Sequence, residues 1–204
     1  MVKLLTKLSA CFAVRRRIVA PKPTVNRIPK GFTLIIDSSE QQPLFSRPPE
    51  GLTIVRKALS KHHDKGWEGD YTIEGYEDKV AIERKKISDL YGYFGEYVIG
   101  RVPTKGAQKI HRLANMKWAA LIIESTETKL NKQYRYTTFT PAHIHGFIVS
   151  LRVRYGIHVY VSNRRNKLEE FVLKHLIKVY NILQSDGEVR GKILEDKSNA
   201  KDMP

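Results

Sequence analysis

The stretch that decides the fold is Asp70–Lys85, "DYTIEGYEDKVAIERK". Two apolar runs flank a short polar turn, a pattern that predicts a hairpin of two strands. Successive strand residues point to opposite faces of a sheet, so Glu83 and Lys85 share one face and Arg84 lies on the other. Pairing the two strands around the turn also brings Asp70 close to Glu83 and Lys85. The hairpin therefore predicts two carboxylates and an ammonium group at one edge of a sheet.

Other strands and helices are predicted on both sides of this hairpin. Apolar, β-branched runs predict buried strands at 32–37, 51–59, 118–124 and 157–161. Apolar residues at helical spacing predict helices at 87–98, 107–114, 141–155 and 168–183, and Thr140 is the expected N-cap of the third. The strands come first as a meander and then alternate with helices. We therefore expect a mixed α/β domain with helices on both faces of a central sheet.

The composition is that of a globular protein. The chain has 204 residues, of which 41% are hydrophobic, enough for one domain with additional tails. No apolar run reaches the roughly 18 residues that a membrane-spanning helix needs, so no membrane contact is expected. A single cysteine, Cys11, excludes a disulfide framework and a multi-cysteine metal cage. A reducing compartment, such as the cytoplasm with its nucleoid or the nucleus, is the expected location.

The strongest compositional signal is the net charge of +15. We divide the chain into a basic, flexible arm at 1–30, a domain at 31–183 that is itself basic, and a polar tail at 184–204. Positive charge of this size favours nucleic acid as a partner, although a basic protein that is merely soluble is the alternative. The arm has the Arg-rich, acid-free composition of an organellar transit peptide, but its few Ser and Thr residues disfavour that interpretation.

The carboxylates of the hairpin suit a hard divalent cation. Mg²⁺ takes oxygen ligands and few protein carboxylates, and it keeps waters and substrate phosphates as its other ligands. Such an ion polarises a phosphodiester, and a neighbouring lysine orients water or stabilises charge on phosphorus. Asp70 followed by Glu83-x-Lys85 is similar to the core pattern of the PD-(D/E)XK nucleases. Glu-x-Lys alone also occurs by chance in charged chains, where it forms only a surface ion pair.

Longer motifs make the pattern more specific. They are "IIDSSEQQPLF" at 35–45, "GDY" at 69–71, "IERKKISDL" at 82–90 and "LIIE" at 121–124. In this order they resemble the nuclease domain of the XPF/ERCC family of structure-specific endonucleases. That family has Asp-x-x-Glu after the first strand, then Gly-Asp, then Glu-Arg-Lys-x-x-x-Asp. The resemblance covers about 32–183 and implies a restriction-endonuclease-like three-layer α/β sandwich, with a central mixed β-sheet flanked by helices.

The resemblance also implies a role for individual residues. Asp37, Asp70 and Glu83 are expected to bind Mg²⁺ or Mn²⁺. Lys85 is expected to position the attacking water or the phosphate, and Arg84 to support it. These five residues form the predicted catalytic set.

Further residues are assigned around this set. Glu40 is either a supporting acid or a loop residue, and Asp89, at the start of the next helix, is also explained by the helix dipole. A basic helix face is expected to contact the DNA backbone, although a solvated face explains it equally well. Its members are Arg101, Lys105, Lys109 and Arg112.

The function that the resemblance implies is metal-dependent endonuclease cleavage of DNA at branches, flaps or junctions of single strand and duplex. The alternatives are a noncatalytic DNA-binding or scaffold module of the same fold and a basic interaction protein whose arm acts on RNA. The sequence departs from the family at Ser39, where an arginine is common, and at Lys86, where a serine is common. Residues 184–204 leave no room for the tandem helix-hairpin-helix domain of eukaryotic and archaeal members. A homodimer or a partner protein is therefore expected to add DNA contacts, and the pathway, whether DNA repair, replication or DNA recombination, is left open.

Overall fold

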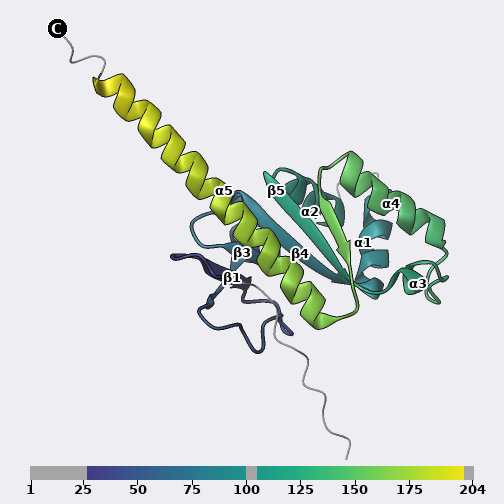
Figure 1. Ribbon diagram of the computed structural model, residues 1–204. Coiled ribbons are helices and arrows are strands. Elements are labelled where there is room, and N and C mark those ends of the chain that lie inside the picture. Colours follow the sequence, from purple (N-terminus) through teal and green to yellow (C-terminus); the bar gives the residue numbers. More distant parts are fainter. Residues whose placement is uncertain (1–26, 100–104, 200–204) are drawn as a thin grey trace, which may run out of the picture.

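The computed structural model describes residues 27–99 and 105–199, and a six-stranded mixed sheet forms its centre (Figure 1). The strands are β1 (Thr33–Asp37), β2 (Thr53–Lys57), β3 (Tyr71–Ile73), β4 (Val80–Lys86), β5 (Trp118–Glu124) and β6 (His158–Val161). Their order across the sheet is β2-β1-β3-β4-β5-β6. Each strand predicted from the sequence is thereby confirmed. Of the arm predicted at 1–30, residues 1–26 lie outside the described part of the chain.

The hairpin predicted at Asp70–Lys85 is formed by β3 and β4. Tyr71 pairs with Ile82 in antiparallel register, which puts Asp70 opposite Glu83. The faces of β4 alternate as expected, because Ala81 and Ile82 belong to the two different hydrophobic cores. The hairpin therefore brings the two predicted carboxylates to the same level of the sheet.

The expectation that the first strands form a meander is wrong. β1 and β2 are parallel neighbours, and β3 pairs antiparallel with the other side of β1. A parallel pair needs a crossover connection of a dozen or more residues, and the segment 38–52 provides it without forming a helix or a strand. The sheet is consequently parallel at its two ends and antiparallel on both sides of β3.

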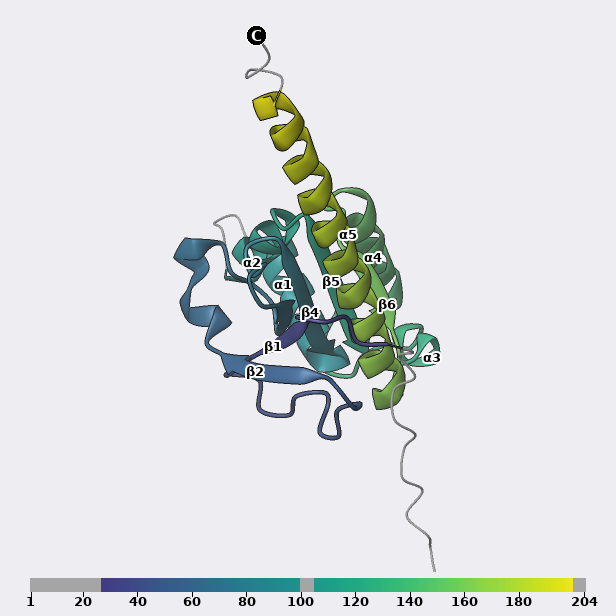
Figure 2. The same ribbon diagram turned by 60° about the vertical axis from the view of Figure 1, so that its left-hand side comes forward.

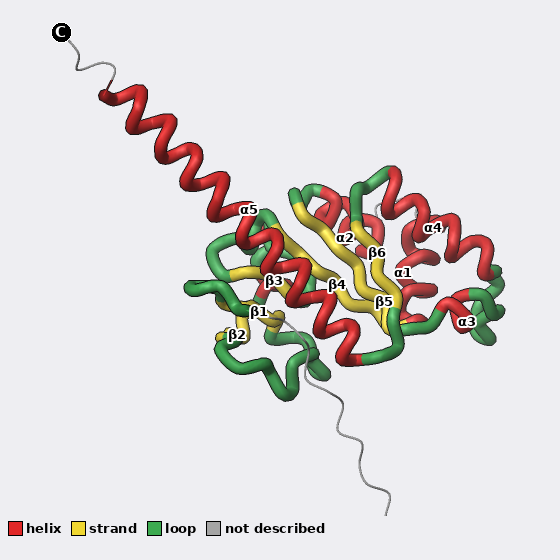
Figure 3. Tube along the Cα trace, viewed as in Figure 1, coloured by secondary structure: helices red, strands yellow, loops and turns green. Residues whose placement is uncertain are grey.

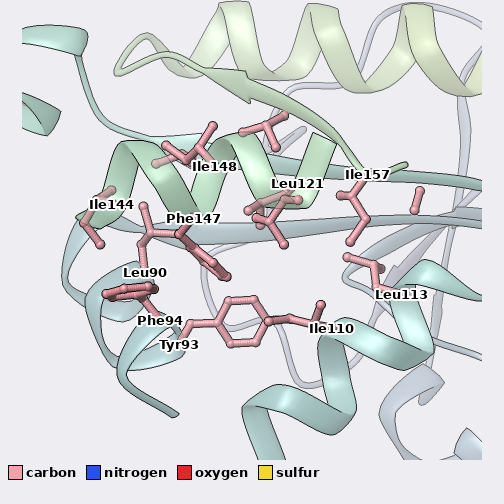
Figure 4. Close-up of a cluster of buried hydrophobic side chains, with 14 of the residues drawn as sticks. Leu90, Tyr93, Phe94, Ile110, Leu113, Leu121, Ile144, Phe147, Ile148 and Ile157 are labelled. Carbon is pink, nitrogen blue, oxygen red and sulfur yellow. The ribbon is translucent and has the colours of Figure 1, made fainter. Parts of the chain in front are cut away.

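Three helices cover one face of the sheet. They are α1 (Ile87–Ile99), α2 (Lys105–Ala114) and α4 (Pro141–Val153). Figure 4 shows apolar side chains from these helices pointing toward the sheet, among them Leu90, Phe94, Ile110, Leu113 and Phe147, where they meet Leu121 of β5. The start of α4 confirms the predicted cap, since the Thr140 backbone N–H donates a hydrogen bond to Nδ1 of His143 at 3.0 Å.

A single long helix, α5 (Arg165–Asn199), covers the opposite face (Figures 1 and 2). Its buried positions face β1, β3, β4 and β5 and include Leu168, Val172, Leu173, Leu176 and Val179. The helix passes Leu183, where the apolar pattern predicted its end, and its last part projects beyond the sheet. The sequence turns polar there, so apolar spacing carries no signal for these turns. The three layers predicted from the sequence are confirmed (Figure 3).

Single helical turns occupy two segments for which the sequence predicted no helix. They are the 3₁₀ turns η1 (Leu59–Lys61) and η2 (His63–Lys65), and α3 (Glu127–Leu130). Leu59 and Leu130 are buried and anchor the first and the last of them. One turn is too short to produce a periodic pattern in the sequence. Within the described residues, no helix has both the length and the apolar character that crossing a membrane requires.

Candidate active site

The backbone around Asp70 sets the position of the site. The Asp70 N–H donates to the Ile82 carbonyl at 2.9 Å, and the Asp37 N–H donates to the Asp70 carbonyl at 2.9 Å. Asp70 is therefore held between β1 and β4. Gly69 precedes it with φ +84°, and a Cβ atom there would lie 3.0 Å from the Ile82 carbonyl oxygen. Glycine adopts this conformation without strain, so Gly69 permits the bend before Asp70.

Glu83 is the buried centre of the site. Its side chain is 0% exposed, and its Oε1 lies 2.5 Å from Lys85 Nζ and 2.7 Å from Lys109 Nζ. Its Oε2 has no hydrogen-bond partner among the described residues. Burial raises the pKa of Glu83, but Lys109 and Lys85 outweigh burial and hold the pKa below its usual value. Glu83 is thus a buried carboxylate that stays charged because two ammonium groups neutralise it.

Asp70 has the opposite electrostatic character. Burial, and then the charge of Glu83, raise the pKa of Asp70 to about 8. Its Oδ2 accepts a hydrogen bond from the Arg84 backbone N–H at 2.7 Å, which fixes the carboxyl group beside β4. Two neighbouring carboxyl groups whose pKa values are pushed apart are typical of functional sites.

Lys85 joins the buried carboxylate to the surface. It stands on the same face of β4 as Glu83, as strand alternation predicted, and its Nζ lies 5.5 Å from the centroid of the Tyr93 ring of α1. A cation over a ring face is attracted by the ring quadrupole, so Tyr93 helps to hold the ammonium in place. The side chain of Lys85 is 20% exposed, which leaves its charge accessible from outside.

A polar pocket of about 320 Å³ opens beside these residues. Its lining comes from the loop after β1, the start of β3, the end of β4 and the start of α1: Ser39, Glu40, Gln41, Gln42, Asp70, Arg84, Lys85, Lys86 and Asp89. Each of these side chains is polar or charged. Such a lining suits a hydrated, ionic substrate and offers little surface to an apolar ligand.

Arg84 builds one wall of this pocket from the other face of β4. Its guanidinium donates to Glu124 at 2.6 Å and to the Gln42 carbonyl at 2.6 Å, and it lies 3.6 Å from Glu40. It therefore ties the loop after β1 to the end of β5. Glu40, for which a supporting role and a loop role were both open, lines the pocket and contacts Arg84.

Asp37 and Asp89 lie at the margins of the site. The Asp37 carboxylate is buried and accepts hydrogen bonds from Ser39 and from the Ser60 backbone N–H, and Asp37 is not among the residues that line the pocket. Its role as a metal ligand stays a prediction. Asp89 is exposed in the first turn of α1 and does line the pocket. Of these two carboxylates, only that of Asp89 lines the pocket.

The basic residues expected on a DNA-facing helix are distributed differently. Lys109 and Arg112 turn inward from α2, where Lys109 binds Glu83 and Arg112 binds another buried acid. Lys105 begins α2, and Arg101 lies outside the described residues. Lys109 and Arg112 are therefore part of the site itself, and only a fraction of their charge faces solvent.

The sequence interpretation missed Glu68. This residue is 2% exposed, and its Oε2 lies 2.5 Å from Arg112 Nε and 3.4 Å from His63 Nδ1. Its Oε1 lies 3.8 Å from Lys109 Nζ. The segment containing it reads as a polar loop, and its only sequence signal is its place two residues before Asp70. Glu68 is a third carboxylate at the site, in contact with the same lysine that binds Glu83.

The donor set fits a hard divalent cation. Asp70 and the partnerless Oε2 of Glu83 are oxygen donors of the kind that Mg²⁺ and Mn²⁺ prefer. Within residues 27–99 and 105–199, no three His, Cys, Asp or Glu side chains are grouped as a complete metal cage. Two protein carboxylates are nevertheless sufficient for an ion that keeps waters and substrate phosphates in its shell.

The mixed sheet, its carboxylate hairpin and the polar pocket define a nuclease-type domain. A family model described as the ERCC4 domain matches residues 36–174. That match spans more than half of the chain, so this chain belongs to the ERCC4-domain family. The resemblance inferred from the motifs is confirmed.

Comparison with solved structures supports the fold. XPF from Aeropyrum pernix in complex with DNA matches with a TM-score of 0.50 and 19% identity, over 74% of this chain and 65% of that chain. A second structure of XPF from Aeropyrum pernix matches with a TM-score of 0.49 and 19% identity. The match covers 72% of this chain and 61% of that chain. This chain thus spans less than two thirds of the solved chains. No curated protein matched its sequence.

Proposed function

We propose that the protein is a Mg²⁺- or Mn²⁺-dependent endodeoxyribonuclease that hydrolyses phosphodiester bonds at branches, flaps or single-strand to duplex junctions. The observation that carries this proposal is the pair Asp70 and Glu83 beside Lys85, of which Asp70 and Lys85 line the polar pocket and Glu83 lies buried behind Lys85. Membership of a nuclease-type family and the excess of basic residues support it. The expected place of action is wherever the cell keeps its DNA, in the nucleoid or nucleus.

Each residue of the pair has a defined part in this proposal. Asp70 and the free Oε2 of Glu83 would hold the cation, and Asp37 is a further candidate ligand. A divalent cation bound there supplies charge that polarises the phosphodiester and stabilises the leaving oxygen. Asp70 would lose its proton on loading, because its raised pKa keeps much of it protonated at neutral pH.

Lys85 would act on the substrate directly. Its ammonium lies between the buried Glu83 and the pocket, so a phosphate in the pocket meets a positive charge on the protein side. A charge fixed in this way stabilises the negative charge that develops on phosphorus, and it orients an attacking water. Arg84 would keep the pocket wall in place through Glu124 and the Gln42 carbonyl.

The proposal is tested with a panel of labelled DNA substrates. We expect the full chain to cut flap, fork or other branched DNA in Mg²⁺ or Mn²⁺, to cut linear duplex more slowly, and to be inactive in EDTA. Gel mapping of the products locates the cuts relative to the junction. The molecular mass of the protein in solution, measured in parallel, tests the proposal that a homodimer or a partner protein provides a second DNA-binding surface.

Two outcomes of this panel would change the assignment. Binding of branched DNA without cleavage or cation uptake would favour a noncatalytic scaffold of the same fold. Loss of all nucleic-acid binding on deletion of residues 1–30 would favour a basic interaction protein whose arm contacts the nucleic acid. A protein that lacks residues 1–30 and still cuts branched DNA would restrict the arm to affinity or targeting.

A further inference from the structure

Two lysines compete for one oxygen of Glu83. Lys85 approaches Oε1 to 2.5 Å and Lys109 approaches it to 2.7 Å. A carboxylate carries a single negative charge, so two ammonium groups overcompensate it. A divalent cation brought to Glu83 would add further positive charge in a buried place, where like charges repel strongly. A movement of one of the two ammonium groups away from Glu83 would relieve this repulsion when the cation binds.

Lys109 has a second buried carboxylate within reach. Its Nζ lies 3.8 Å from Oε1 of the buried Glu68, which approaches it from the segment before β3. Among the described residues, the ion pairs of Lys85 involve Glu83 alone. Lys85 is also held over the Tyr93 ring. A shift of Lys109 by about one ångström would exchange one buried carboxylate for another without exposing either charge.

Glu68 is fixed in place to receive this lysine. Arg112 Nε binds its Oε2 at 2.5 Å, while the oxygen that faces Lys109 is Oε1. Lys109 Nζ thus lies 2.7 Å from a carboxylate of β4 and 3.8 Å from one of the segment ahead of β3. The Lys109 side chain is 27% exposed, and Glu68 offers it a buried carboxylate without a move into solvent.

We propose that Lys109 is a positioning residue that neutralises Glu83 in the metal-free protein and moves to Glu68 when a divalent cation binds. This movement of Lys109 from Glu83 to Glu68, called the handover below, rests on the proposed cation site. It adds to that site a carboxylate that receives the displaced ammonium group. Glu68 sets the cation affinity through Lys109, without being a ligand. Lys109 thereby keeps a buried carboxylate as its partner in both states.

The test is a double-mutant cycle read by Mn²⁺ binding to the DNA-free chain, with free Mn²⁺ measured by electron paramagnetic resonance. Lys109→Met removes the competitor and should tighten Mn²⁺ binding by about tenfold, the range in which outer-shell partners act. Glu68→Gln removes the receiving charge and should weaken binding by about tenfold. In the double variant the Glu68→Gln effect should vanish, because no lysine needs to be received.

Other roles for Glu68 give a different cycle. If Glu68 were a ligand, or acted only through its long-range charge, Glu68→Gln would weaken Mn²⁺ binding equally with and without Lys109, and the handover would be wrong. Lys174→Met and Glu170→Gln, an ion pair on the outer side of α5, are matched controls that should leave affinity unchanged. Circular dichroism and thermal unfolding of each variant confirm that it is folded, and Glu68→Gln retains an acceptor for Arg112.

The handover and the nuclease proposal fail in different ways. Mn²⁺ binding with a non-additive cycle but no DNA cleavage would contradict the nuclease and support the handover. DNA cleavage with an additive cycle would contradict the handover alone. Absence of Mn²⁺ binding in the wild type and in Lys109→Met would overturn both.

Discussion

Asp70→Asn is expected to make the metal-free protein more stable at alkaline pH while it abolishes DNA cleavage. Burial, and then Glu83, raise the pKa of Asp70 from its ordinary value of 3.8 to about 8. Below pH 4 the folded and the unfolded chain both hold this proton. Between pH 4 and 8 the folded chain still holds it after the unfolded chain has released it, so stability falls as pH rises. Asparagine has no proton to lose and removes this slope.

Urea unfolding in EDTA between pH 4.5 and 9 measures the effect. We expect the variant to gain about 2 kcal/mol or more over the wild type at pH 9, and little at pH 4.5. Asp78→Asn, at an exposed position of the same hairpin, is the matched control and should leave the slope unchanged. If the free energy of unfolding changes with pH in the same way for wild type and Asp70→Asn, the pKa of Asp70 is not raised. That result would contradict a buried, protonated Asp70 beside Glu83.

Glu83→Gln is expected to abolish cleavage and, unlike Asp70→Asn, to destabilise the protein. The change removes a ligand of the proposed cation and leaves Lys85 and Lys109 without their shared carboxylate. We expect single-turnover cleavage of branched DNA in Mg²⁺ to fall by about a thousandfold. Loss of one partner of a buried ion pair costs about 3 kcal/mol or more of folding stability, so unfolding should be measured in parallel.

The control for this variant is Glu74→Gln, at an exposed position of the same hairpin. It should cut at the wild-type rate. DNA affinity, measured in Ca²⁺ or EDTA by fluorescence anisotropy, should change little in Glu83→Gln, because the buried side chain does not reach the backbone of bound DNA. Cleavage within a few fold of wild type by folded Glu83→Gln would place the active site elsewhere.

The sequence predicted the strands and the hairpin because their apolar alternation is local. The register of β3 and β4 follows from a short turn, and alternation then assigns Glu83 and Lys85 to one face. The parallel pairing of β1 with β2 depends on the path of the connecting segment 38–52, and no local sequence pattern predicts that path. The helical turns of α5 beyond Leu183 are polar, so apolar spacing could not reveal them.

The site was predictable where chemistry and local geometry coincide. Asp70, Glu83 and Lys85 come together because one hairpin carries them all. Lys109 and Glu68 reach the same place only through tertiary packing of α2 against the segment before β3. A lysine on a charged helix reads as a solvent-facing residue, and an acid in a polar segment reads as a loop residue. Their burial and mutual contact become visible only in the folded chain.

The most direct test of the central claim is to locate the cation on the chain itself. Fe²⁺ added in place of Mg²⁺, with ascorbate and peroxide, generates radicals that cut the backbone next to the bound ion. We predict cuts in the wild type beside Asp70 and Glu83, suppressed by excess Mg²⁺ and lost in the Asp70→Asn/Glu83→Gln double variant. Cuts that map to other segments, or that persist unchanged in the double variant, would contradict a cation site on this hairpin.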